Sequence, residues 1–164
     1  MLEVKARITH LKQIEAGDGV SYGHRFIAPT AMKIAVVGIG YADGVPRLLS
    51  NRLKVAVTST HHQNNTLSDK TYLVSQIGAI TMDQLMLDVS GIPYLQEGDI
   101  VTLLGYAGTD SIKAYHLSAD EWATKTETIS WEILCGFKNR LPRITLAPSQ
   151  EMSAAELSTS SQAL

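Results

Sequence analysis

Short apolar runs separated by glycine, proline, asparagine and aspartate are the feature that most limits the fold of this 164-residue chain. Six runs have the length and composition of strands: residues 4–14, 34–39, 53–58, 72–80, 84–89 and 100–104. Gly17-Asp18-Gly19, Asn64-Asn65 and Glu97-Gly98-Asp99 supply turn residues that tolerate a positive φ or bond their own backbone. Because no long helical pattern separates the runs, they predict a closed or nearly closed β-barrel.

Two short helices are expected after the last strand. The string Ser118-Ala119-Asp120-Glu121 has the form of a capping box and predicts a helix through about residue 124. Residues 129–137 predict a second helix. We interpret residues 61–68 as a polar loop extension between two strands. The chain is therefore divided into one domain, residues 1–146, and a Ser- and Ala-rich tail, residues 147–164, which we expect to be disordered.

Composition excludes several classes of protein. A net charge of −2 without a run of Lys or Arg gives no electrostatic footprint for nucleic acid. The longest apolar run, residues 34–40, is too short to span a bilayer. The single cysteine, Cys135, excludes an internal disulfide, and no secretory leader is recognisable at the start. We therefore expect a cytoplasmic protein with neither a nucleic-acid nor a membrane partner.

Two other motifs are set aside. Gly38, Gly40 and Gly44 suggest a dinucleotide-binding loop, but the third glycine falls one place late and no long helix follows. His61 and His62 are adjacent, with no cysteine or carboxylate at ligand spacing, which indicates loop histidines rather than metal ligands. No metal site is predicted.

Four short motifs in a fixed order carry a family resemblance: Val20-Ser21-Tyr22-Gly23, Gly40-Tyr41-Ala42-Asp43-Gly44, Met82-Asp83-Gln84 and Arg140-Leu141-Pro142-Arg143. Together they resemble the C-terminal domain of alanine racemase, a pyridoxal-phosphate (PLP) enzyme, over about residues 3–143. The resemblance implies a mainly β fold, a Greek-key-like β-barrel with short helices near its C-terminal end. It also implies an isomerase that interconverts L- and D-alanine and so provides D-alanine for peptidoglycan in the cell wall.

Tyr22 is the candidate catalytic residue. By residue type alone, a tyrosine after a Gly-Asp-Gly turn is usually a half-buried aromatic at the rim of a strand. A phenol acts as a general base only beside groups that favour its ionised form. The resemblance implies that Tyr22 is this base, removing or returning the α-proton on one face of the substrate.

Met82 and Asp83 are the candidate substrate-binding pair. The resemblance implies that the Met82 backbone N–H faces the substrate carboxylate and that Asp83 supports this loop. Periodicity alone favours another role, in which Asp83 is a strand-end aspartate that accepts backbone N–H bonds. Both roles are compatible.

Tyr41 and Arg47 would line the corridor into the active site, although by residue type Arg47 could equally be a solvated turn arginine. Trp131 occupies the place of a tyrosine whose hydroxyl contacts the cofactor phosphate in the family, and it offers only an N–H donor. A competing interpretation makes Trp131 a buried residue in the core of a short helix. Ala79 replaces an arginine that normally borders the corridor.

The lysine that binds PLP belongs, in this family, to an N-terminal TIM barrel whose lysine-bearing string does not occur in this chain. We therefore expect a domain of a longer, head-to-tail homodimeric protein, in which Tyr22 serves the partner subunit's active site. The chain alone is expected neither to bind PLP nor to racemise alanine. Two alternatives remain open: a serine or broader amino-acid racemase domain, and a free-standing, non-catalytic partner module.

Overall fold

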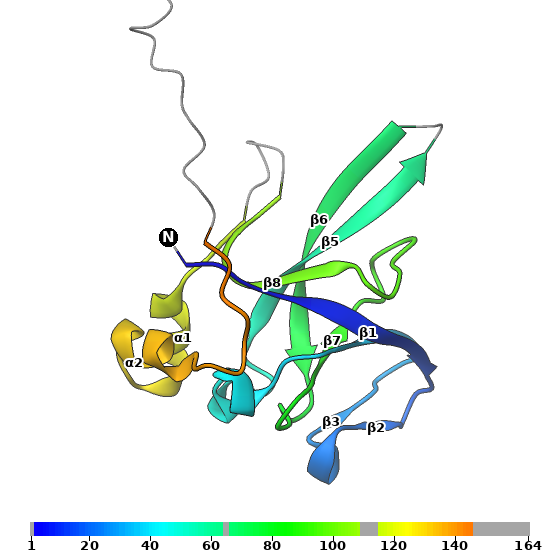
Figure 1. Ribbon diagram of the computed structural model, residues 1–164. Helices are drawn as coiled ribbons and strands as arrows, with labels where there is room; N and C mark the ends of the chain where they lie inside the picture. The colour runs from blue at the N-terminus through cyan, green and yellow to red at the C-terminus, as the bar shows by residue number, and fades with distance from the viewer. Residues whose placement is uncertain (1, 64–65, 109–114, 146–164) are drawn as a thin grey trace, which may run out of the picture.

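The computed structural model describes residues 2–63, 66–108 and 115–145. Six antiparallel strands close into a barrel, which confirms the predicted fold (Figure 1). Around the barrel the strands follow the order β1 (Val4–Ile14), β4 (Met32–Val37), β7 (Leu85–Asp88), β6 (Thr66–Ile77), β5 (Lys54–Gln63) and β8 (Ile100–Ala107). The consecutive strands β5, β6 and β7 lie side by side and β8 returns beside β5, which is a Greek-key arrangement.

Strand β1 closes the barrel because its two halves pair with different neighbours. Its first half pairs with β8, where Val4 lies opposite Leu104. Its second half pairs with β4, where Ile14 lies opposite Met32. The register shifts within both ladders, as expected where a strand bends from one partner to the next.

The alternation of side chains along each strand fills the barrel interior. In β7, Leu85 and Leu87 are buried, whereas Met86 and Asp88 are partly exposed. The main core also takes in Trp122, Ala123 and Ile133 from the two helices, and Phe137, which follows the second helix. The helices therefore pack against the barrel and share its core.

Two short helices follow β9 (Tyr115–Leu117), as the sequence predicts: α1 (Ala119–Thr126) and α2 (Ser130–Gly136). The Ser118 hydroxyl accepts the Glu121 N–H at 3.2 Å, so the predicted cap of α1 is present. Helix α1 runs two residues beyond the predicted end.

A small two-stranded sheet was not predicted. Strands β2 (Gly19–Val20) and β3 (Phe26–Ile27) are joined through the 3₁₀ turn η1 (Tyr22–His24) and lie below the barrel in Figure 1. A second core joins this sheet to the barrel. It consists of Ile14, Val20, Ala28, Met32, Ile34 and Ile77, with Phe26 and Met86 packed against it.

The predicted polar loop at residues 61–68 is wrong. Strands β5 and β6 remain paired as far as Gln63 and Thr66, although β5 contacts β8 only up to Thr58. The pair therefore projects from the barrel as an arm (Figure 1). Most residues of this arm are polar, so it has no apolar alternation for a sequence pattern to detect. The expected Asn64-Asn65 turn and the tail at residues 147–164 lie outside the described residues.

Candidate functional site

Tyr22 lies in the turn between β2 and β3, with 73% of its surface exposed. The preceding residue, Ser21, has a left-handed φ of 63°, and its hydroxyl donates to the Ala79 carbonyl oxygen at 2.7 Å. Gly78 passes so close that an added Cβ would lie 2.8 Å from the Val20 carbonyl oxygen. The turn is thus fixed against residues 78 and 79, while the Tyr22 ring is largely open to solvent.

Tyr41 lies in a second turn that is bonded to the loop carrying Met82. The Tyr41 N–H donates to the Thr81 carbonyl oxygen at 3.0 Å, and the Ala42 N–H donates to that of Met82 at 3.0 Å. Gly40 is required at this contact because an added Cβ would overlap the Thr81 carbonyl oxygen. The Tyr41 side chain is 46% exposed. The structure therefore brings Tyr41 and Met82 together.

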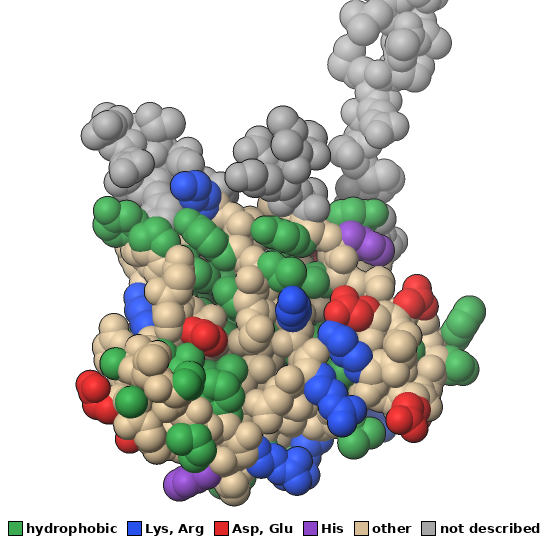
Figure 2. Space-filling model, turned by 180° about the vertical axis from the view of Figure 1, so that it is seen from behind, with side chains coloured by type: hydrophobic (Ala, Val, Ile, Leu, Met, Phe, Trp, Pro, Cys, Tyr) green, Lys and Arg blue, Asp and Glu red, His purple; other side chains and the backbone are tan. Residues whose placement is uncertain are grey.

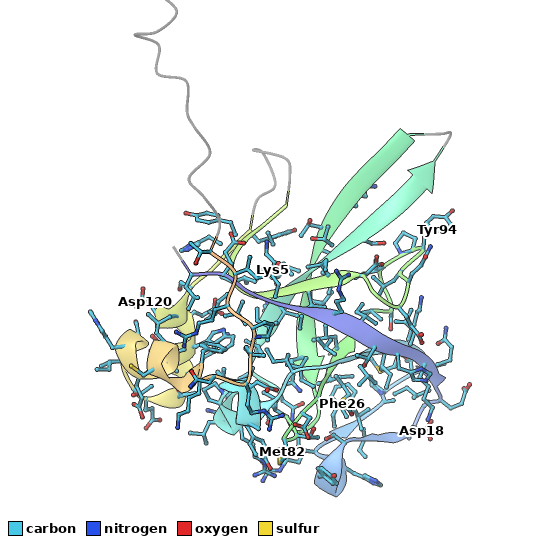
Figure 3. The ribbon with its side chains drawn as sticks, viewed as in Figure 1. Lys5, Asp18, Phe26, Met82, Tyr94 and Asp120 are labelled. Atoms are coloured by element: carbon cyan, nitrogen blue, oxygen red, sulfur yellow. The ribbon has the colours of Figure 1, made fainter. Side chains whose placement is uncertain are left out.

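Met82 belongs to a tight loop just before β7, at the lower edge of the molecule in Figure 3. Thr81 closes this loop: its N–H donates to the Gln84 carbonyl oxygen at 2.9 Å, and its hydroxyl accepts the Gln84 N–H at 3.1 Å. The Met82 side chain is 48% exposed, and its backbone N–H has no partner in the described part of the chain. That N–H is available to a carboxylate.

Arg140 links two carboxylates beside these turns. Its Nη2 donates to Asp83 Oδ1 at 2.6 Å, and its Nε lies 3.1 Å from Asp43 Oδ1. The hydrogen bond to Asp83, followed by the charge of Asp43, raises the pKa of Arg140 above its ordinary range. The structure gives Asp83 an arginine partner rather than the backbone N–H groups that periodicity favoured. Sequence reasoning missed Asp43 and Arg140 as functional candidates, although both lie in the family motifs.

Two other predicted positions differ in exposure. Arg47 begins the 3₁₀ turn η3 (Arg47–Leu49) and is exposed, with no side-chain partner among the described residues. This placement agrees with a solvated turn arginine and with a corridor residue, so its role stays a prediction. Ala79 is 1% exposed. Its methyl group is enclosed, and its carbonyl oxygen supports the Tyr22 turn.

Trp131 is 73% exposed on α2, so the competing interpretation of a buried core residue is wrong. It lines a hollow of about 510 Å³ together with Lys138 and Arg143. Helix α2 is close to the Tyr41 turn, because an added Cβ at Gly44 would lie 2.7 Å from the Gly136 carbonyl oxygen. The structure therefore places the helix that carries Trp131 against the turn that carries Tyr41.

The donors near these turns suit an anionic group of a ligand. The Trp131 indole N–H and the Met82 N–H are donors without partners in the described ranges, and Lys138 adds a positive charge beside Trp131. Such donors favour anionic groups. Because Tyr22 and Trp131 are each 73% exposed, a second surface must complete any enclosed site.

Two features are absent from the described residues. No group of three or more His, Cys, Asp or Glu there is arranged to hold a metal ion. Within the same ranges, no helix has the length and apolar character needed to cross a membrane. Figure 2 shows the opposite face, where acidic and basic side chains lie near one another.

Comparisons with known proteins agree with the motifs. A model of the alanine racemase C-terminal domain matches residues 1–145. Alanine racemase from a Nostoc species is 57% identical over 144 residues, which cover 88% of this chain and 33% of the relative. That from a Synechocystis species is 51% identical, over 89% of this chain and 35% of the relative. The chain thus spans about a third of the length of these curated relatives.

Solved structures show the same likeness. Alanine racemase from Bacillus anthracis with bound L-Ala-P has a TM-score of 0.71 and 31% identity, over 89% of this chain and 33% of that chain. Alanine racemase from Bartonella henselae with covalently bound pyridoxal phosphate has a TM-score of 0.67 and 31% identity, over 87% of this chain and 34% of that chain.

Proposed function

This chain belongs to the alanine racemase C-terminal domain family, and from that premise we propose that it is part of a PLP-dependent isomerase that interconverts L- and D-alanine. The observation that carries the proposal is that the exposed Tyr22 ring lies on a turn held against residues 78 and 79. Its turn is bonded to residue 79, and the Met82 loop begins two residues further along the same segment. This placement supports the proposal that one short segment, residues 78–82, positions both a proton-transfer group and a carboxylate-binding group.

Tyr22 would hold or accept a proton at Oη on one face of the alanine α-carbon. A lysine from an N-terminal barrel domain would serve the opposite face, so removal on one side and return on the other inverts the centre. The Met82 N–H would donate to the substrate carboxylate while Asp83 supports the loop. Tyr41 and Arg47 would line the approach.

PLP, when bound, supplies an electron sink that stabilises negative charge at the α-carbon. From this chain, Trp131 would face the cofactor phosphate through its indole N–H. The remaining contacts to the cofactor would come from the barrel domain, which is why we propose that this chain alone is inactive and does not bind PLP.

We further propose a homodimer in which this domain completes the partner subunit's site. Tyr22, Tyr41, Met82 and Trp131 are large side chains that are each at least 46% exposed. Exposed apolar side chains gathered near one another commonly mark an interaction surface. In the cytoplasm, such an enzyme would supply D-alanine for the peptidoglycan of the cell wall.

Tyr22→Phe in the full-length protein tests the proposal. It removes the proton carrier and keeps the ring, so kcat/KM for alanine should fall about 10²–10⁴-fold in both directions. Tyr106→Phe is the matched control, since Tyr106 is also exposed but lies on β8 and stacks on His116. Near-normal racemisation by Tyr22→Phe would make Tyr22 a rim aromatic and defeat the assignment.

A serine or broader amino-acid racemase is the second candidate, and the exposed Trp131 at the family's tyrosine position favours it. The two differ in the ratio of kcat/KM for alanine and serine in the full-length protein. A clear preference for alanine supports the main proposal. A free-standing partner module would instead lack a lysine-bearing barrel in its coding sequence upstream of Met1.

A further inference from the structure

Arg140 joins three segments that are far apart in the sequence. It follows α2, yet its guanidinium contacts Asp43 in the Tyr41 turn and Asp83 in the Met82 loop. Nε and Nη2 are used for different carboxylates, at 3.1 Å and 2.6 Å. A planar guanidinium presents donors in a rigid fork, so its two contacts fix the carboxylates relative to one another.

In this cluster of Asp43, Asp83 and Arg140, two negative charges surround one cation. Asp43 is 7% exposed, and its second oxygen, Oδ2, accepts the Gly40 N–H at 2.9 Å. Asp43 therefore cannot turn away without breaking a buried hydrogen bond. If Arg140 were uncharged, Asp43 and Asp83 would repel one another across the contact between the turn and the loop.

Two backbone hydrogen bonds already join this turn and loop, from Tyr41 to Thr81 and from Ala42 to Met82. The Asp43–Arg140–Asp83 cluster adds a second link between the same two segments. We propose that Arg140 is a positioning residue for the substrate carboxylate. It holds the Met82 N–H in register with the Tyr41 turn and offsets the negative charge of two neighbouring aspartates. This inference rests on the proposed function.

Arg140→Gln in the full-length protein should raise the KM for alanine by roughly tenfold to a hundredfold, because a displaced Met82 N–H would lose its hydrogen bond to the charged carboxylate, which weakens binding by about that factor. The kcat should change less, since Tyr22 is held by other contacts. Arg7→Gln is the control, because Arg7 also makes an exposed hydrogen bond, to the Gly98 carbonyl oxygen at 2.8 Å. An unchanged KM in Arg140→Gln overturns the proposal.

Two further variants separate positioning from charge alone. Arg140→Lys keeps the charge but not the fork, so it should restore less than half of the lost affinity for alanine. Full restoration would contradict the positioning role. The double variant Arg140→Gln/Asp83→Asn removes the repulsion and should have a lower KM than Arg140→Gln. If the effects of Arg140→Gln and of Asp83→Asn alone simply add in the double variant, Arg140 and Asp83 do not act as a unit and the proposal fails.

A readout that is independent of activity completes the test. The Ala42 amide, which donates to the Met82 carbonyl oxygen, should exchange its hydrogen at least several-fold faster in Arg140→Gln than in wild type or Arg7→Gln. Unaltered exchange overturns the inference. The Tyr22→Phe experiment distinguishes a failure of the proposed function from a failure of the role proposed for Arg140. Full activity there defeats the proposed function, whereas a large loss there, with an unchanged KM in Arg140→Gln, defeats only the role of Arg140.

Discussion

The two helices of this domain use tryptophan in opposite ways. Trp122 of α1 is 2% exposed, belongs to the main core and lies 6.1 Å from the Phe137 ring, measured between ring centroids. Trp131 of α2 is 73% exposed and lines an open hollow. Both helices contribute to the core, but the tryptophan of α1 anchors it, whereas the tryptophan of α2 presents a large aromatic surface. This exposure agrees with the proposal that α2 faces the cofactor-binding domain, and the role of Trp131 there stays a prediction.

Of the substitutions that test this comparison, Trp122→Ala should cause the largest loss of stability. Removing a buried tryptophan costs about 3–5 kcal/mol of the free energy of unfolding, through lost burial and the cavity left behind. Urea denaturation of this chain measures it, with Trp131→Ala as the matched control. Equal losses from the two substitutions would contradict the division between an anchoring and a presenting tryptophan.

Gly44→Ala should cause the next largest loss of stability, because the added methyl group would disrupt the contact between α2 and the Tyr41 turn. Gly44 has a φ of 113°, and an added Cβ would lie 2.7 Å from the Gly136 carbonyl oxygen. Left-handed backbone strain and overpacking together should lower the free energy of unfolding by about 2–4 kcal/mol.

Gly17→Ala isolates the backbone strain in the Gly44 experiment. Gly17 has a φ of 92°, but an added Cβ would meet nothing within 4 Å. The difference between the two variants in urea denaturation therefore measures the contact with α2. If both lose the same stability, α2 is not held by this close approach.

Trp131→Tyr should have the smallest effect on stability, within about 0.5 kcal/mol, because the ring is exposed. In the full-length protein it should tighten PLP binding by up to roughly tenfold to a hundredfold. The restored hydroxyl can donate to a charged phosphate, a hydrogen bond worth about 1.5–3 kcal/mol. The PLP dissociation constant and the melting temperature of the same variant provide the check. A lower melting temperature with unaltered affinity would end the phosphate-site interpretation of Trp131.

The barrel could be predicted from the sequence because alternation and turn residues are local signals. All six predicted runs correspond to barrel strands, with bounds that match for β1 and differ elsewhere. The strands β2, β3 and β9 escaped prediction, since two or three residues are too few to show a period of two. The arm of β5 and β6 escaped it because its residues lack apolar alternation.

The candidate site was predicted less completely. The motifs around Tyr22 and Met82 pointed to positions that the structure leaves exposed, but the roles of these residues stay predictions. The contact of Arg140 with Asp43 and Asp83 joins residues from distant parts of the chain, and no local pattern reports such a contact. For the same reason, the sequence alone could not tell the buried Trp122 from the exposed Trp131. Each lies in a short helix that carries both apolar and polar residues.

The way in which β1 closes the barrel has a kinetic consequence. Val4 pairs with Leu104, so β1, the first barrel strand in this domain, must wait for β8, the last one, before the ring is complete. Local pairs such as β5 with β6 can form early, whereas this closing ladder requires a very large loop to be ordered first. We expect the seam between β1 and β8 to form late in folding. Until it does, the edges of both strands are open to pairing with other chains.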